Sequence, residues 1–540
     1  MRIPKSKWWD CSFTQCLENL MIRKLITLFK IGRKLALSDA LHVVSKAFEI
    51  PITIKIFFSL IGLFGKRSLN QGYSEEERLC RSMESMGITF IKLGQFLATR
   101  PDIIGEKLSD QLQTLQDKVP AYSKDIALNE IKKGVGNENF EDFINISEPI
   151  AAASIAQVHK AQIKDEGVLK EVAIKVLRPN IKKVFNEEIE ALMLLAYIIE
   201  SFIKKTKRLR LVEVVFLLKE ITNHEMDLRF EAAAANEFFE NTINDVGFKI
   251  PKIYWKLTSD NVLTLDWVDA ISIREVEKIK TLGVNLKMLA RDIIQHFLRH
   301  AVRDGYFHAD MHQGNLLVDN SGQLIFIDFG IMGRIDKINR RFLAEILYGF
   351  IKRDYKKVAE VHIVAGLVSK DVNSDELAQA LRSIGEPIFG QSVKDISGGK
   401  LLKQLFDITE KFNMQTQPQL LLLQKTMVVV EGVARKLDPE ANIWEISQPV
   451  LEKWLKETKD PLNEIGNILK DTSEVLKKLP EFPQVMDKAN QALTFLASGQ
   501  IPKNSNAYSS LNEKRMELNS FKNQSIIGLL FLVILSFIVF

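Results

Sequence analysis

Cysteine is scarce in this chain of 540 residues, and no apolar segment opens it. The cysteines are Cys11, Cys16 and Cys80, an odd number whose spacing follows no disulfide framework. This pattern argues against a disulfide-bonded secreted fold and is typical of a reducing compartment. The first residues, MRIPKSKWWDCSFTQ, contain no apolar run of the kind found in a secretory signal.

Net charge is also small for a chain of this size. The sequence has 73 Lys and Arg against 68 Asp and Glu, a formal balance of +5. Because the basic residues are interleaved with acids, the composition does not predict a nucleic-acid partner. Basic clusters within residues 5–34 and at 204–210 are typical of solvated faces. The first cluster alternates with Leu, Ile and Phe, so a helix on a membrane surface is an alternative there.

Long apolar runs are rare, and the most pronounced one ends the chain. Residues 525–540, SIIGLLFLVILSFIVF, contain no charged residue and follow a polar stretch. As a helix they would extend roughly 24 Å, slightly less than a hydrocarbon core of ~30 Å. We favour a membrane-anchoring helix over a buried one, with Lys514, Arg515 and Lys522 on a cytoplasmic flank. A shorter run at 50–64 carries Lys55 and is interpreted as buried or interfacial.

The remaining pattern predicts a mixed helical and stranded protein without internal repeats. Residues 1–120 have helical periodicity, with Pro120 ending the last helix, and 125–136 predict one more helix. Runs rich in Val and Ile predict strands at 153–163 and 171–177, followed by helices at 182–204 and 212–241. Short strands are expected at 252–257 and 262–268. After a helix at 285–304, residues 315–330 predict a hairpin with its turn at 320–322, and the chain is then mostly helical to about 500.

The strongest chemical signal lies in and around this hairpin. His308-x-Asp310-x-x-x-x-Asn315 has the spacing of a kinase catalytic loop, with Ala309 where arginine is usual. Asp310 would orient or deprotonate a nucleophile, and Asn315 would hold a metal ion. Thirteen residues after Asn315, Asp328 begins a Asp-Phe-Gly triplet and would chelate Mg²⁺. A zinc site at His308 and His312 is the weaker alternative, since no cysteine or third histidine lies near, and His308 is better interpreted as structural.

A nucleotide site needs a cationic clamp, and the strand Val-Ala-Ile-Lys ends at Lys175, where a kinase places the lysine that contacts the α- and β-phosphates. About 20 residues earlier lies a loop rich in small residues, where a kinase has glycines. The residues of this stretch that we predict to bind the nucleotide are Ala151, Ala152, Ala153, Ser154, Ile155, Ala156, Gln157 and Val158. The Cβ of alanine disfavours positive φ, so the loop should be stiffer than a glycine-rich one.

A carboxylate should pair with Lys175, and residues 224–238 supply Glu225, Asp227 and Glu231. On one helix, Glu225 and Glu231 would face different sides, so only one should reach Lys175. Upstream, Lys92 and Gln95 lie in the largely apolar stretch GITFIKLGQFLATRPD. A buried lysine needs a carboxylate partner, and the candidates are Asp310, Asp328, Glu225 or Asp227.

These motifs together resemble the UbiB family of atypical kinase-like proteins, over roughly residues 75–500. The family's K-x-G-Q motif corresponds to residues 92–95, its alanine-rich loop to 151–161, its E-x-D motif to 225–227 and its catalytic loop to 308–315. The resemblance implies that Glu231 pairs with Lys175, and that Lys92 and Gln95, together with Glu225 and Asp227, regulate the site by blocking a protein substrate. Two features depart from the family: Gln313 replaces a usual proline, and one apolar C-terminal segment stands where two are common.

The resemblance implies an α+β, kinase-like fold with a small β-containing lobe and a helical lobe. We expect an N-terminal helical extension (1–120), the two lobes (121–268 and 269–500), a polar linker (501–524) and a membrane helix (525–540). The implied cofactors are ATP or ADP and Mg²⁺. The implied partners are an isoprenoid quinone precursor or other lipid, the membrane, and other ubiquinone-biosynthesis proteins. A bacterial inner membrane is the implied location, with the bulk of the protein on the cytoplasmic face.

Two functions follow from these expectations. The first is ATP hydrolysis or small-molecule phosphorylation in ubiquinone biosynthesis, favoured because Lys175, Asp310, Asn315 and Asp328 are all present. The alternative is a nucleotide-binding pseudokinase scaffold without essential catalysis. A hydroxylase is not supported, since the sequence has no flavin or nicotinamide fingerprint and no iron-ligand set.

Overall fold

The structure is a computed structural model of the chain. It describes residues 73–98, 119–202, 210–369, 371–390 and 418–458, together with parts of 23–37, 104–115 and 408–412. The predicted linker, the C-terminal apolar segment, the run at 50–64 and the cluster at 204–209 lie outside the described residues. No helix in the described part of the chain is long and apolar enough to cross a membrane.

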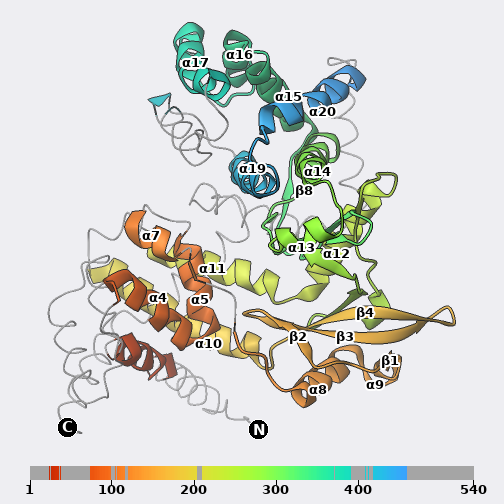
Figure 1. The fold of residues 1–540 in the computed structure, drawn as a ribbon. Helices are drawn as coiled ribbons and strands as arrows, with labels where there is room; N and C mark the ends of the chain where they lie inside the picture. Colours follow the sequence, from red (N-terminus) through yellow and green to blue (C-terminus); the bar gives the residue numbers. More distant parts are fainter. Residues whose placement is uncertain are drawn as a thin grey trace, which may run out of the picture.

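In the described part of the N-terminal extension, three helices pack on one another (Figure 1). They are α4 (Glu75–Met86), α5 (Ile88–Ala98) and α7 (Glu106–Leu112). Ser74 begins α4 with a capping box to Glu77. A Cβ at Gly94 would lie 2.3 Å from Leu115 Cδ1, so the glycine of the K-x-G-Q motif permits close packing of α5. The prediction that Pro120 ends the last helix is wrong, because α7 already ends at Leu112.

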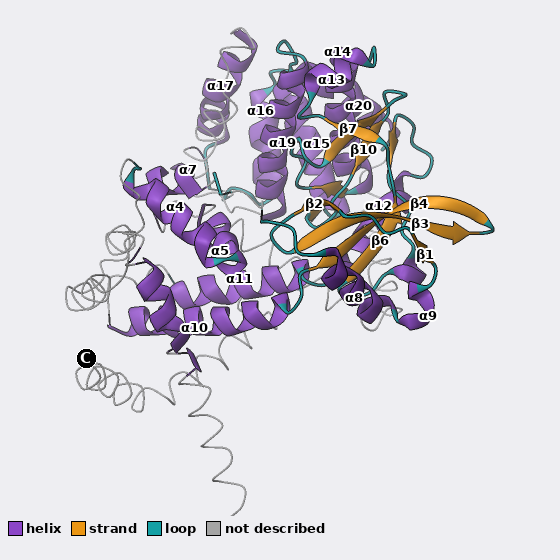
Figure 2. Ribbon diagram, turned by 60° about the horizontal axis from the view of Figure 1, so that its bottom comes forward, coloured by secondary structure: helices purple, strands orange, loops and turns teal. Residues whose placement is uncertain are grey.

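A twisted antiparallel sheet follows in the chain (Figure 2). Its strands are β1 (Phe143–Ile144), β2 (Pro149–Ala152), β3 (Ala156–Asp165), β4 (Val168–Leu177) and β6 (Val262–Asp266). The strand order is β1-β3-β4-β6, with β2 also paired to β3. On β4, Val172, Ile174 and Val176 are fully buried in one cluster with residues of α8 (Lys124–Val135) and α9 (Asn137–Phe140). Because side chains alternate along a strand, Lys175 points the other way.

Three helices connect this sheet to the extension and to the site. They are α10 (Ile181–Phe202), α11 (Leu211–Glu225) and α12 (Leu228–Thr242). The expectation of one helix over 212–241 is wrong, since Met226 and Asp227 are not helical and separate α11 from α12. Asp227 has extended backbone angles and its side chain accepts a hydrogen bond from the Arg229 amide, as an N-cap does. The two glutamates flanking the break therefore belong to different helices.

The second half of the chain supports the site with small sheets and a helical array (Figure 1). One sheet has the order β5-β10-β9-β7, and β8 pairs with β11. The strands are β5 (Phe248–Lys249), β7 (Ala270–Ser272), β8 (Tyr306–His308), β9 (Leu316–Asp319), β10 (Leu324–Phe326) and β11 (Met332–Arg334). The helices are α13 (Val276–Thr281), α14 (Leu286–Arg299), α15 (Lys337–Ile351), α16 (Tyr355–Val364), α17 (Ser374–Gly390), α19 (Pro418–Leu437) and α20 (Ile443–Glu457).

The predicted hairpin at 315–330 is confirmed. Strands β9 and β10 pair antiparallel, with Leu317 opposite Ile325, and the turn between them includes Ser321, which is bonded to Asp319. The strand expected at 252–257 is wrong. Ile253 makes a single bridge to Leu265, and the chain then turns through a 3₁₀ helix at Trp255–Leu257.

Candidate active site

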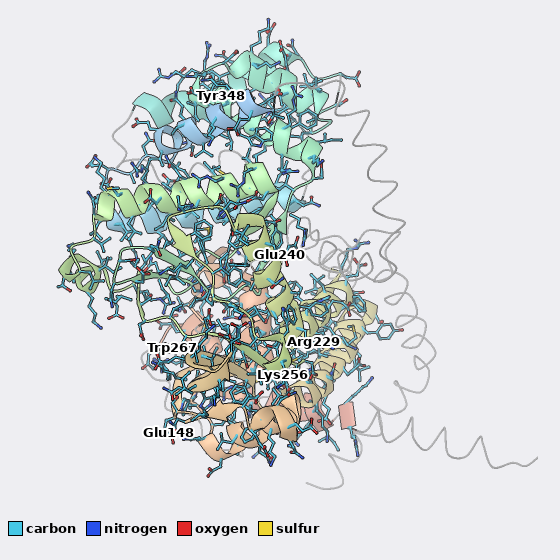
Figure 3. The ribbon with its side chains drawn as sticks, turned by 90° about the vertical axis from the view of Figure 1, so that its right-hand side faces the viewer. Glu148, Arg229, Glu240, Lys256, Trp267 and Tyr348 are labelled. Atoms are coloured by element: carbon cyan, nitrogen blue, oxygen red, sulfur yellow. The ribbon has the colours of Figure 1, made fainter. Side chains whose placement is uncertain are left out.

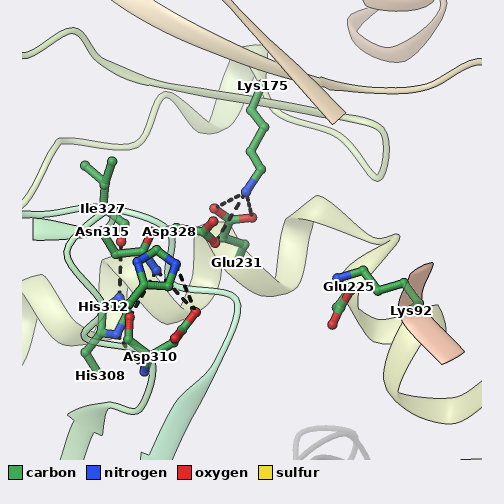
Figure 4. A network of polar contacts seen from close by, with 10 residues as sticks. All are labelled: Lys92, Lys175, Glu225, Glu231, His308, Asp310, His312, Asn315, Ile327 and Asp328. Carbon is green, nitrogen blue, oxygen red and sulfur yellow. Dashed lines mark hydrogen bonds and ion pairs between the residues drawn. The ribbon is translucent and has the colours of Figure 1, made fainter. Parts of the chain in front are cut away.

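Lys175 is held between two carboxylates from distant parts of the chain (Figure 4). Its Nζ lies 2.8 Å from both carboxylate oxygens of Glu231, on α12, and 3.5 Å from Oδ1 of Asp328, after β10. The pairing with Glu231 is the one that the family resemblance implied. The Lys175 and Glu231 side chains are 17% and 12% exposed, so the charges interact with little screening.

The protonation of this cluster follows from its charges. Burial disfavours the Lys175 ammonium, but Asp328 and Glu231 outweigh it and raise the pKa of Lys175 above its ordinary value. The Lys175 ammonium in turn holds the pKa of Asp328 below its ordinary value, with burial opposing it. Asp328 is therefore ionised at neutral pH and able to serve as a cation ligand.

The backbone at Asp328 directs its side chain into the site. Its φ is +61°, in the left-handed region that few residues other than glycine adopt. Asp and Asn are among the side chains that tolerate this region. Such conformations occur at sites where the surroundings hold the chain in place.

The catalytic-loop motif lies beside this cluster and is hydrogen-bonded to Ile327, which precedes Asp328 directly after β10. His308 is 1% exposed, its Nε2 is 3.1 Å from the Ile327 carbonyl, and its Nδ1 accepts from the Asp310 amide. Burial lowers the pKa of His308, so the ring is neutral. The structural role expected of this histidine is confirmed. The Asn315 carbonyl accepts a hydrogen bond from the Ile327 amide at 3.1 Å, which is a second contact between the catalytic loop and Ile327.

Asp310 and Asn315 face each other across the loop. The Asn315 Nδ2 donates to the Asp310 carbonyl at 3.0 Å and to its Oδ2 at 3.3 Å. His312 also faces this carboxylate, with Nε2 3.8 Å from Asp310 Oδ2, and its Nδ1 accepts from the Gly314 amide. A Cβ at Gly314 would lie 2.7 Å from the His312 ring, so glycine permits this arrangement.

Residues of α19 and β7 donate hydrogen bonds to the catalytic loop. Thr426, buried on α19, donates to the Ala309 carbonyl at 3.1 Å. Further along α19, Lys436 donates to the Gln313 side chain at 2.9 Å, and Ser272 donates to the Gln313 carbonyl. Gln313, which stands where the family usually has proline, thus accepts a hydrogen bond through its side-chain oxygen. Proline has no such oxygen and could not make this contact. Sequence reasoning missed these bracing residues because nothing local marks them.

The donor set fits a magnesium-bound nucleotide. Mg²⁺ prefers oxygen ligands, and the Asp328 carboxylate and the side-chain oxygen of Asn315 are of that kind. Because the Asn315 nitrogen is engaged with Asp310, its oxygen is the atom it can offer a cation. Lys175 is the cationic group placed for phosphate oxygens. In the described part of the chain, no group of three or more His, Cys, Asp or Glu side chains could hold a metal ion.

The alanine-rich loop joins β2 to β3 on the other side of Lys175. Val158 is paired with Lys175 in the register of β3 and β4. None of the loop residues has positive φ, as expected of alanine. The Gln157 side chain is 1% exposed and bonds both the amide and the carbonyl of Tyr122. Nucleotide contacts predicted for this stretch would therefore come from the loop's backbone rather than from the Gln157 amide.

The residues predicted to regulate the site have different partners: Lys92 pairs with Glu225, whereas Gln95 and Asp227 contact other residues. Lys92, on α5, lies 2.8 Å from Glu225 Oε2, which confirms that a carboxylate among the four candidates meets this lysine. Its charge also helps to lower the pKa of Asp328, by less than the charge of Lys175 does. The Gln95 amide lies 3.5 Å from the Leu115 carbonyl. Asp227 is paired with Arg229, an exposed side chain labelled in Figure 3.

Comparisons with known proteins find relatives over most of the chain. Residues 114–362 match the model of the ABC1 atypical kinase-like domain, and residues 381–442 match that of the UbiB helical domain. A protein of Marinobacter nauticus named "Probable protein kinase UbiB" is 38% identical over 448 residues, covering 82% of this chain and 81% of its own. One of the same name from Histophilus somni is 37% identical, covering 77% and 78%. A solved structure of Rv3197 from Mycobacterium tuberculosis with erythromycin is 22% identical, covers 66% of this chain and 90% of its own, and has a TM-score of 0.45.

Proposed function

The chain belongs to the UbiB family of atypical kinase-like proteins, and from this premise we propose that it is an ATP-dependent enzyme that serves ubiquinone biosynthesis at an inner membrane. Its reaction is ATP hydrolysis or phosphoryl transfer to a small molecule rather than ordinary protein phosphorylation. The observation that carries the proposal is the convergence of Lys175, Asp328 and the Asp310–Asn315 pair on one site.

Each residue has a separate task in this reaction. Lys175 binds phosphate oxygens, and Glu231 fixes the position of its ammonium. Asp328 and Asn315 would hold Mg²⁺, which would supply charge neutralisation at the phosphates. Asp310 accepts the proton of the attacking hydroxyl or water. Lys92 belongs to the N-terminal extension, is paired to Glu225 at the end of α11, and would limit access for a protein substrate.

The test uses Asp310→Asn, which preserves the shape of the side chain but removes the proton acceptor. We expect Mg²⁺-dependent ATP turnover to fall on the order of 100-fold, within the range of a lost general base, while ADP binding is retained. Cells carrying the variant should lose any phosphorylated quinone precursor that mass spectrometry detects in the wild type. Asp292→Asn, at an exposed aspartate on α14, is the control.

The scaffold alternative makes the opposite prediction for the same variant. If the enzyme proposal is wrong, Asp310→Asn cells will make ubiquinone at the wild-type rate although ATP turnover has been lost. That result would assign the chain a nucleotide-dependent structural role.

Replacing Lys92 with alanine should release the restraint from the N-terminal extension. We expect autophosphorylation or ATP turnover to rise several-fold, because the cation that faces Glu225 and acts on Asp328 is gone. Since Glu225 is left half-buried, the free energy of unfolding should fall by about 2 kcal/mol, too little to unfold the chain. Turnover and thermal melting measure the two effects. Lys107→Ala, which removes an exposed lysine paired to Glu76, should alter neither, and unchanged turnover in Lys92→Ala would dismiss the regulatory role.

Deleting residues 525–540 should move the protein from the membrane to the soluble fraction at high salt. The deletion removes 13 apolar side chains from bilayer contact, more than a single acyl chain contributes. Fractionation of cells measures the effect, and appending an unrelated spanning helix should restore membrane retention. Full retention of the truncated chain would assign the anchor to the basic N-terminal residues or to 50–64.

A further inference from the structure

The peptide group that joins Ala309 to Asp310 is hydrogen-bonded at both of its polar ends. Its N–H, the amide of Asp310, donates to Nδ1 of the buried His308 at 3.1 Å. Its C=O, the carbonyl of Ala309, accepts from the hydroxyl of Thr426 on α19 at 3.1 Å. Because the N–H and C=O bonds of a trans peptide point in opposite directions, the two partners hold the peptide from opposite sides. The orientation of the peptide that leads into Asp310 is therefore fixed.

The Ala309 carbonyl depends on Thr426 for its hydrogen bond. No other residue in the described part of the chain donates to this carbonyl. The Thr426 hydroxyl, which is fully buried, also lies 2.8 Å from the carbonyl of Leu422 on its own helix. In an α-helix that carbonyl accepts the backbone amide four residues later, so it does not need the hydroxyl hydrogen. Removing the hydroxyl would thus leave the Ala309 carbonyl without a donor, and buried backbone groups are rarely left so.

The helix that carries Thr426 is packed on the elements that lead into the loop. Thr426 comes 117 residues after Ala309, on a helix that contacts α14 and β11. Strand β11 pairs with β8, which ends at His308, two residues before Asp310. The helix also lies within residues 381–442, the segment that matches the UbiB helical domain. The hydroxyl is therefore a fixed contact from this segment to the catalytic loop.

We propose that Thr426 is a positioning residue that orients the Asp310 carboxylate through the Ala309 carbonyl, so that the segment at 381–442 takes part in setting the rate of the reaction. This inference rests on the proposed ATP-dependent function, in which Asp310 accepts a proton. If the Ala309–Asp310 peptide were free to rotate, the carboxylate would move away from that proton, and a small misplacement of a reacting group lowers a rate strongly. Nucleotide binding is assigned to Lys175 and Asp328, so it should not change.

The experiment measures ATP turnover and ADP affinity of full-length variants at Thr426. Thr426→Val keeps the shape of the side chain but removes the hydroxyl. We expect kcat to fall roughly tenfold, the effect of one lost hydrogen bond, with KM for ATP and Kd for ADP unchanged. Thr426→Ser keeps the hydroxyl and should restore most of the turnover. An unchanged kcat in Thr426→Val, or a serine variant as slow as the valine one, would overturn the inference.

Thr222→Val is the matched control for this comparison. Thr222 is also a buried helical threonine, on α11, but its hydroxyl has no hydrogen-bond partner among the residues that the structure describes. Its kcat and ADP affinity should equal those of the wild type. If Thr426→Val weakened ADP binding as much as it slowed turnover, Thr426 would be a merely structural residue.

A double variant shows whether Thr426 acts through Asp310. In Asp310→Asn no carboxylate is left to orient, so adding Thr426→Val should lower the residual turnover by less than about twofold, as expected for residues that act as a unit. A further tenfold loss in the double variant would overturn the inference, because it would show an effect that does not pass through the carboxylate.

A crystal structure of the full-length wild type with ADP and Mg²⁺ needs no substitution, so it tests the inference even if the variants misfold. Thr426 Oγ1 should lie within about 3.5 Å of the Ala309 oxygen. A longer distance would overturn the inference and leave the proposed function standing. A wild-type chain that does not turn over ATP would overturn the proposed function itself, and this inference with it.

Discussion

Replacing Asp328 with asparagine should abolish the Mg²⁺ dependence of nucleotide binding and lower ATP turnover on the order of 100-fold or more, as expected for a lost metal ligand. The carboxylate is ionised because Lys175 lowers its pKa, and a neutral amide cannot replace that charge. Asparagine is the suitable substitution because it tolerates the left-handed φ of +61° at this position, whereas alanine would add backbone strain.

Titration of the protein with ADP, with and without Mg²⁺, measures this effect. The wild type should bind more tightly with Mg²⁺, and the variant should bind equally with and without it. Asp292→Asn again controls for the loss of an unrelated carboxylate. If Asp328→Asn kept its Mg²⁺-dependent binding, Asp328 would not be a metal ligand.

Replacing Lys175 with methionine should have the largest effect on stability. Methionine fills a similar volume but leaves Glu231 and Asp328 facing each other without the ammonium between them. Breaking a buried ion pair by removing one partner costs about 3 kcal/mol or more of the free energy of unfolding. Nucleotide affinity should fall as well, since the cationic contact to the phosphates is lost.

The stability loss in Lys175→Met should depend on pH. In the wild type, Lys175 lowers the pKa of Asp328, and this stabilises the fold above the ordinary carboxyl pKa and is lost as pH falls through the lowered value. Without Lys175, both carboxyls should have raised pKa values, which favour the folded state only when they are protonated. The difference in melting temperature should therefore be largest near neutral pH and shrink toward about pH 4.

Lys182→Met provides the matched control for this pH series. Lys182 pairs with Asp260, and both side chains are largely exposed, so its removal should cost about 1 kcal/mol or less. A Lys175→Met protein as stable as this control at neutral pH would contradict the buried cluster described here.

The site residues that lie close together in the sequence could be predicted from their spacing, whereas contacts between distant residues could not. The spacing of Asp310, Asn315 and Asp328 follows from one loop and one hairpin, so it could be interpreted without knowing the rest of the fold. Pairing Lys175 with Glu231, 56 residues away, needed the family resemblance. The contact of Thr426 with the Ala309 carbonyl could not be predicted, because any sequence possesses such a carbonyl group.

The errors in the predicted fold have local causes. Asp227 is a good helix N-cap, but no glycine or proline precedes it, so the apolar periodicity continued across the break. At 252–257 the alternation of Ile253 and Trp255 with polar residues imitated a strand, whereas only the first part bonds to β6. Periodicity identifies which side chains are buried but does not reveal where the backbone turns between them.

The break after Glu225 places two glutamates, six residues apart, opposite lysines from two different parts of the molecule. Lys92 belongs to the same polypeptide as the carboxylate it meets, so under the proposed regulation the local concentration of the blocking group would not change with the amount of protein in a cell. Dilution cannot release it, and no second protein has to be made to supply it. Release of the pair would require a competitor for Glu225 or a movement of α5 away from the end of α11.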